Sequence, residues 1–182
     1  MKEKQKDVDL ECIDRVLSGE RGAYGILVTK YYQKMYRVAY RITGSSADAE
    51  DALQQAFLKS FTNLHTFKKK STFSTWLYRI TSNISINIYH QKKKETVGVE
   101  EDSISTVDDG LRAIESKEEI DTVRKAIRKL PKKQRLTLIF RVYEKLAYKE
   151  IAAILKCSEG AVKANYFHAV TKLKNELTSY MK

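Results

Sequence analysis

The C-terminal stretch YKEIAAILKCSEGAVKANYFHAVTKLK, residues 148–174, decides the fold of the second half of the chain. Its apolar residues predict two helices, roughly 148–155 and 159–179, separated by a tight Lys-Cys-Ser turn with Ser158 as the N-cap. The shorter helix has an apolar inner face, and Val162 falls three residues past the start of the longer one. This spacing is typical of a helix-turn-helix.

The longer of these helices has two unlike faces when its residues are placed at about 100° intervals. Val162 and Leu177 mark the apolar face. The opposite face carries cationic, small and aromatic side chains: Lys163, Ala164, Phe167, His168, Thr171 and Lys174. An outward phenylalanine beside cations suits the major groove of DNA, where rings meet thymine methyl groups and cations meet phosphate or guanine. We therefore interpret this face as a DNA-reading surface, and an ordinary helical hairpin with a soluble face is the alternative.

The remainder of the sequence favours an all-α fold, because glycine and proline are scarce, seven and one, and no stretch sustains strand-like alternation. Apolar periodicity predicts further helices at about 8–19, 23–42, 45–64, 73–88, 116–129 and 131–143. Ser45 and Asp48 form a capping-box pattern, and Pro131 suits the first turn of a helix.

Charge is distributed in three blocks. The chain has 34 Lys and Arg against 23 Asp and Glu, a net charge of +11 that favours a polyanionic partner such as nucleic acid or an anionic membrane surface. Residues 1–94 carry 17 basic and 9 acidic side chains, residues 95–121 carry 2 and 10, and residues 122–182 carry 15 and 4. The acidic block lacks aromatic residues, so we expect a flexible linker over 95–115 between two small helical domains, 1–94 and 116–182.

Residue spacing argues against catalytic and metal chemistry. Cys12 and Cys157 lie far apart, and His65 and His90 lack partners at metal-ligand spacing. No carboxylate pair, nucleophile with a base or glycine-rich phosphate loop lies at a helix end, so we predict no enzyme activity, no cofactor and no metal. No signal-peptide core is present and no apolar run approaches the ~20 residues of a membrane span, so we expect a cytoplasmic protein without stable membrane insertion.

One predicted helix, 46–64, carries an acidic strip in an otherwise basic domain. Opposite its apolar stripe lie three polar residues and one leucine: Asp48, Asp51, Gln55 and Leu58. We interpret this strip as a docking surface for a basic protein. The alternative is that acids in a first turn only complement the helix dipole.

Four segments, in this order, resemble the extracytoplasmic-function sigma factors, the small initiation subunits of bacterial RNA polymerase. They are DAEDALQQAFLKSF (48–61), STFSTWLYRITSN (71–83), LPKKQRLTLIFRVYEKLAYKEIAAIL (130–155) and SEGAVKANYFHAVTKL (158–173). The resemblance covers nearly all of both basic domains. It implies a first domain that binds polymerase and the promoter minus-ten element, a helix-turn-helix for the minus-thirty-five element, and no catalysis. The implied partners are core RNA polymerase, duplex and single-stranded promoter DNA, and an anti-sigma factor.

The resemblance also suggests roles for individual residues. The acidic strip matches the part that docks on the clamp helices of polymerase, although the family often has Glu where this chain has Gln55. Lys163, Ala164 and His168 match base- or phosphate-facing positions, where Arg and Ser are commoner. These departures leave the promoter sequence open.

A loop rich in rings and lysines matches the part of the family that grips an unstacked promoter base. Phe67 and Asn83 fall at these gripping positions, and Lys68, Lys69 and Lys70 occupy a loop that more usually reads Arg-Gly with an acid. Rings stack on bases, lysines hold the strand backbone, and Asn offers both a donor and an acceptor to a base edge. We predict that these residues hold an extruded base. The alternative is that Phe67 fills the core and the lysines are only solvated.

Two further departures fall in the helix-turn-helix. Ala147 stands where Ser or Thr often caps the helix, and Lys156 stands where Gly often turns, each at a cost of about 1 kcal/mol. The leading interpretation is a sigma factor. The alternatives are a polymerase-independent helix-turn-helix regulator and an interaction module controlled by partner capture. The acidic strip and the charge blocks favour the first, because a lone regulator needs neither.

Overall fold

The computed structural model describes residues 7–95 and 115–180, and every regular element within these ranges is helical. The α-helices are α1 (Val8–Leu17), α2 (Tyr24–Thr43), α3 (Ser46–Thr62), α4 (Phe73–Glu95), α5 (Glu115–Lys129), α6 (Lys132–Leu138), α7 (Tyr148–Leu155) and α8 (Glu159–Tyr180). A π-helical turn, Ile139–Tyr143, extends α6. The predicted all-α class is confirmed, whereas the predicted linker lies almost entirely outside the described residues.

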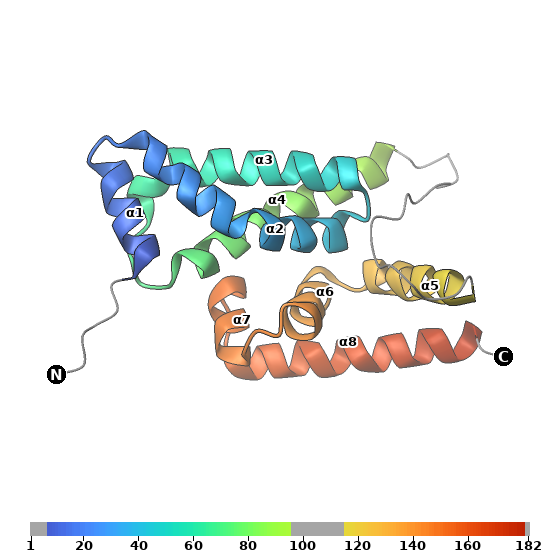
Figure 1. The fold of residues 1–182 in the computed structure, drawn as a ribbon. Helices are drawn as coiled ribbons and strands as arrows, with labels where there is room; N and C mark the ends of the chain where they lie inside the picture. Colours follow the sequence, from blue (N-terminus) through green and yellow to red (C-terminus); the bar gives the residue numbers. More distant parts are fainter. Residues whose placement is uncertain (1–6, 96–114, 181–182) are drawn as a thin grey trace.

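The helices form two groups (Figure 1). In the N-terminal group, α2, α3 and α4 pack lengthwise against one another, and α1 lies across one end. In the C-terminal group, α8 packs against α5, α6 and α7. The C-terminal group lies along the side of the N-terminal group that faces away from α3.

Small side chains set the spacing in the N-terminal group. Ala39 of α2, Ala49, Ala52 and Ala56 of α3, and Ile84 of α4 form one buried cluster. Alanine has no side chain beyond Cβ, so the three helix backbones approach closely. A larger cluster beside it contains the aromatic side chains at the start of α4.

Helix ends follow the residues that the sequence marks as caps. The backbone N–H of Asp48 donates to Ser45 Oγ at 3.3 Å, and that of Ala161 donates to Ser158 Oγ at 3.1 Å. At the start of α7, which lacks a capping hydroxyl, the Glu150 carboxylate accepts instead from the backbone N–H of Ala147 at 2.8 Å. This bond offsets part of the predicted loss at that cap.

The turn between α7 and α8 is left-handed. Lys156 has φ 50° and ψ 54°, a conformation that glycine adopts without a Cβ penalty. Val162 and Ala169 of α8 are fully buried, as are Ile151 and Ile154 of α7. The predicted helix-turn-helix is therefore present, with one apolar face of α8 directed into the C-terminal group.

The two groups share apolar packing. The Tyr78 ring of α4 meets the Phe140 ring of the π-helical turn with centroids 5.4 Å apart, and both side chains are buried. One continuous hydrophobic cluster consequently runs from the N-terminal group into the C-terminal group. We call this boundary the seam.

Candidate nucleic-acid interface

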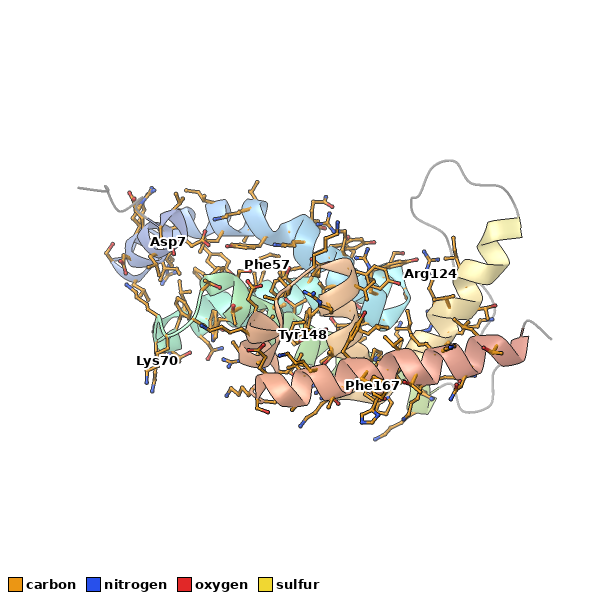
Figure 2. The ribbon with its side chains drawn as sticks, turned by 90° about the horizontal axis from the view of Figure 1, so that it is seen from below. Asp7, Phe57, Lys70, Arg124, Tyr148 and Phe167 are labelled. Carbon is orange, nitrogen blue, oxygen red and sulfur yellow. The ribbon has the colours of Figure 1, made fainter. Side chains whose placement is uncertain are left out.

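The outward face of α8 presents the predicted DNA-reading residues to solvent. Phe167 is 65 % exposed, and its ring lies 5.8 Å from that of His168. Lys163, Ala164 and Thr171 are exposed on the same helix. Figure 2 shows Phe167 on the outer side of α8, directed away from the rest of the molecule. The structure thus brings these five residues together on one surface.

Lys163 is held only by weak surface contacts. Its Nζ lies 3.4 Å from Glu159 Oε1, and both side chains are well exposed. The same Nζ lies 5.8 Å from the centre of the Tyr148 ring. An exposed ion pair of this kind contributes at most about 1 kcal/mol, so a phosphate or a guanine can replace it.

The Phe67 ring lies in the core. It is 7 % exposed and packs against Phe73, with centroids 6.0 Å apart, and against Trp76, with centroids 5.4 Å apart. In this arrangement the ring faces are covered by protein and offer no platform for a base. The sequence predicts that this ring binds an extruded base, with a core position as the alternative.

The loop lysines have unequal surroundings. Lys68 and Lys70 are exposed, and Figure 2 shows Lys70 at one end of the molecule. Lys69 has φ 54°, and its Nζ donates to Asp14 Oδ1 of α1 at 2.6 Å. The ammonium groups of Lys68 and Lys70 are therefore the more accessible ones for a strand backbone.

Asn83 lies apart from this loop. It is exposed on α4, ten residues after Phe73, which corresponds to about 15 Å along the helix axis. Its Oδ1 accepts a hydrogen bond from Lys132 Nζ of the C-terminal group at 3.2 Å. Among the described side chains, Asn83 thus meets α6 rather than Phe67.

The acidic strip on α3 is shorter than predicted. Asp48 is 5 % exposed and forms an ion pair with Lys92 at the far end of α4. Asp51 and Gln55 are exposed, and Leu58 is 65 % exposed. Helical periodicity placed all four on one face, but the packing of α4 against the first turn of α3 covers Asp48.

The seam contains polar residues that the sequence did not single out. The Glu144 side chain is 3 % exposed. Its carboxylate lies 3.7 Å from Arg41 Nη1 and accepts a hydrogen bond from Tyr78 Oη at 3.1 Å. Burial, followed by the charge of Glu144, raises the pKa of the Tyr78 phenol. Glu144 is one of only four acidic residues in 122–182, and this scarcity is the sequence feature that could have pointed to it.

Arg135 is the second such residue, and it is 1 % exposed. Its guanidinium stacks 4.3 Å from the centre of the Tyr89 ring and donates to the backbone oxygen of Arg128 at 3.2 Å. Burial lowers the pKa of this group, and the nearby Tyr89 opposes that effect. Local periodicity gives no sign that a cation here is buried, because its partners come from both groups.

Within the described part of the chain, no group of His, Cys, Asp and Glu side chains is arranged to hold a metal ion. No described helix is long and apolar enough to cross a membrane.

Comparison with known sequences gives two family matches. Residues 27–95 match the family model described as Sigma-70 region 2, and residues 120–173 match Sigma-70, region 4. RNA polymerase sigma-H factor of Pseudomonas aeruginosa is 33 % identical over 175 residues, which cover 90 % of this chain and 91 % of that protein. ECF RNA polymerase sigma-E factor of Escherichia coli K12 is 29 % identical over 180 residues, which cover 93 % and 94 %.

The fold is also found among solved structures. Sigma factor RpoE of Bartonella quintana, solved in complex with the anti-sigma factor NepR, matches with a TM-score of 0.66 and 21 % identity. The match covers 85 % of this chain and 96 % of that one. The likeness therefore extends over both helical groups.

Proposed function

This chain belongs to the extracytoplasmic-function sigma factors of bacterial RNA polymerase, and we propose which of its surfaces makes each of the contacts that such a factor needs. A sigma factor binds core RNA polymerase, directs it to promoters and helps to melt the minus-ten element. In this chain, α8 reads the upstream duplex, α3 docks on polymerase, and α4 with its preceding loop takes the melted strand. The chain acts in the cytoplasm by binding, without catalysing a reaction itself.

The outward face of α8 carries this proposal. Phe167 is 65 % exposed while Val162 and Ala169, on the opposite side, are fully buried. A large exposed ring between cations has no packing role, yet it can meet thymine methyl groups in a major groove while Lys163 and His168 reach phosphate or guanine. We assign this face to the minus-thirty-five element.

For polymerase docking we assign Asp51, Gln55 and Leu58 on α3. Leu58 offers an apolar anchor at 65 % exposure, and Asp51 offers a carboxylate to a basic partner. Asp48 supports this surface from beneath, because its ion pair with Lys92 joins the start of α3 to the end of α4.

For the melted strand we assign Asn83, Lys68 and Lys70. The lysines hold phosphates and Asn83 offers a donor and an acceptor to a base edge. Phe67 acts indirectly in this scheme, since its packing against Trp76 fixes the loop that carries the lysines.

Core polymerase binding tests the docking assignment. Asp51→Lys, measured by pull-down with purified core enzyme, should lose most binding while the melting temperature stays within a few degrees of the parent. The neighbouring exposed residues Gln54 and Gln55 form a matched pair, and only Gln55→Ala should weaken docking. Normal affinity of Asp51→Lys for core enzyme would remove α3 from the interface.

Promoter-specific transcription in vitro distinguishes a sigma factor from a regulator that acts without polymerase. The isolated chain should bind promoter duplex weakly, and promoter-specific transcripts should appear only after core polymerase is added. Tight sequence-specific binding by the chain alone would favour the regulator instead.

An anti-sigma factor is a further proposed partner. The similar RpoE of Bartonella quintana was solved with one, and the likeness covers most of both chains. Capture of the tagged chain by a protein that blocks its transcription with core enzyme would identify such a partner.

A further inference from the structure

Helix α1 lies beside the loop that carries the strand-directed lysines. Figure 1 shows it across the end of the N-terminal group at which α3 ends and α4 begins. Figure 2 shows Lys70 at the same end of the molecule as Asp7, the residue that caps α1. No surface of α1 is assigned to polymerase or to duplex DNA, so its contacts with this loop point to a different role.

One ion pair joins α1 directly to the loop. Lys69 Nζ donates to Asp14 Oδ1 at 2.6 Å, although 55 residues separate the two in sequence. Both side chains are partly exposed, at 43 % for Lys69 and 60 % for Asp14. A pair in such a position is screened by solvent and adds little to the stability of the fold. It can still decide between loop conformations that have similar free energies.

The backbone at Lys69 shows why such a contact matters. Its φ of 54° lies in the left-handed region, where a residue with a Cβ is strained and glycine is not. Without a compensating contact, Lys69 would favour other backbone conformations, and the flanking Lys68 and Lys70 would change direction with it. The ion pair with Asp14 favours the left-handed turn because it holds the end of the Lys69 side chain on α1.

A second connection between α1 and the loop runs through the core. Asp9, in the first turn of α1, is 7 % exposed and accepts hydrogen bonds from Lys30 Nζ at 2.6 Å and from Tyr31 Oη. The Tyr31 ring lies 5.6 Å from the Phe73 ring, which lies 6.0 Å from the Phe67 ring. Helix α1 is thereby linked to the first residue of α4 and to the residue before the three lysines.

The two connections differ in strength, and the difference separates their roles. Burial, followed by the hydrogen bond to Asp9, raises the pKa of the Tyr31 phenol, so it remains a hydrogen-bond donor at neutral pH. Loss of the buried Asp9 carboxylate would leave this donor without its acceptor and destabilise the N-terminal group. Loss of the exposed Asp14 carboxylate would leave the core intact. Asp14 is therefore the residue at which the loop can be altered without unfolding the protein.

We propose that α1 sets the conformation of the strand-binding loop. Asp14 is a positioning residue in this scheme, because it holds Lys69 in the left-handed turn and thereby fixes the directions of Lys68 and Lys70. The inference rests on the proposed assignment of these two lysines to the melted strand. A loop that is already ordered loses less conformational freedom when a strand binds, so the contact raises the affinity for the strand.

The charge of Asp14 allows a test by the sign of the effect. A carboxylate near a bound strand repels phosphates, so its removal should strengthen strand binding if charge alone acts. If Asp14 positions the loop, its removal should weaken binding. An exposed ion pair shifts such equilibria by about two- to fivefold, which sets the expected size of the effect.

Asp14→Asn and the matched control Glu11→Gln each remove one exposed negative charge from α1. Strand affinity is measured by fluorescence anisotropy for each full-length variant in holoenzyme, with a fluorescein-labelled single-stranded oligodeoxynucleotide of randomised sequence at fixed salt. Asp14→Asn should bind more weakly than Glu11→Gln by the factor given above. Asp14→Glu, which keeps the carboxylate, should recover most of the loss. Melting temperatures within a few degrees of the parent verify that the variants are folded.

Two further measurements separate positioning from a purely structural role. In a Lys69→Gly background the ion pair is gone and the left-handed turn is unstrained, so Asp14→Asn should no longer weaken strand binding. The backbone N–H of Phe67 donates to the Leu64 oxygen at 3.0 Å. Its hydrogen should exchange faster in Asp14→Asn than in Glu11→Gln, because the loop that follows it is less restrained.

Unchanged hydrogen exchange at Phe67 in Asp14→Asn would overturn the inference. So would strand affinity of Asp14→Asn equal to or above that of Glu11→Gln, provided that Lys68→Ala and Lys70→Ala weaken strand binding in holoenzyme. Normal strand binding by both lysine variants would instead contradict the proposed function. The exchange rates at Phe67 would then decide the role of α1 by themselves.

Discussion

The outward face of α8 and the strand-directed surface of α4 are both predicted to meet promoter DNA, yet they differ in accessibility. On α8 the ring of Phe167 points to solvent and its neighbours are exposed. On the other surface the ring of Phe67 is buried, Lys69 is paired with Asp14, and Asn83 is bound by Lys132. The face of α8 is thus open to solvent in this structure, whereas the surface on α4 is contacted by the C-terminal group at Asn83.

The largest expected effect is on stability. Phe67→Ala removes a buried ring from between Phe73 and Trp76 and should lower the free energy of unfolding by about 3–5 kcal/mol. Phe167→Ala removes an exposed ring and should change it by about 0.5 kcal/mol or less. Thermal or urea unfolding of the two variants checks the contrast. Equal stabilities would show that the Phe67 ring is not a core residue.

Duplex binding should depend on α8 alone. Lys163→Ala should weaken binding of holoenzyme to the upstream element by about 1–3 kcal/mol if the lysine reads guanine, with relaxed preference at that base pair. If the lysine meets phosphate, all sequences should weaken alike. Lys172→Ala, on the same helix outside the assigned face, is the control in a binding assay over a set of operator variants. An equal loss in both variants would reduce the role of Lys163 to general charge.

Contacts between the loop lysines and phosphates should be detectable in the salt dependence of strand binding. Each lysine that meets a phosphate of a single strand adds about 0.7 to the slope of log affinity against log salt concentration. Lys68→Ala and Lys70→Ala should each lower that slope in holoenzyme, measured with a minus-ten strand. Lys69→Ala should lower it less, because Lys69 is already paired with Asp14. A full decrement for Lys69→Ala would instead mean that its ion pair breaks on binding.

The smallest effect is a titration at the seam. Burial, followed by the positive charges of Arg135, Lys132, Lys93 and Lys94, lowers the pKa of His90 on α4. A histidine whose folded pKa lies below its unfolded value destabilises the folded state at low pH, so this contribution to stability improves as pH rises through that window. Glu144→Lys should move Lys132 and Arg135 away and raise the pKa of His90, as followed by the imidazole proton resonances. An unchanged pKa would mean that the seam stays closed.

Local sequence patterns were sufficient to predict the helices and the exposed face of α8. An apolar stripe every three to four residues determines which side of α8 is buried, so Lys163, Phe167 and His168 could be placed from sequence alone. The same rule failed for Asp48, because the end of α4 covers it through Lys92, more than forty residues away in sequence. The burial of Glu144 and Arg135 could not be predicted for the same reason, since it depends on partners in the other group. The assignment of Phe67 was ambiguous because a ring in a lysine-rich loop suits both a core and a base.

The pairing of guanidinium groups with tyrosine rings along the seam has a thermodynamic consequence. Arg41 on Tyr143 and Arg135 on Tyr89 would both enter water together with the rings that cover them. Exposure of apolar surface raises the heat capacity and exposure of polar surface lowers it, so the two contributions partly cancel. Separation of the groups should therefore show a small heat-capacity change for the area exposed. Its equilibrium constant would then follow a nearly straight van't Hoff line over a wide range of temperature.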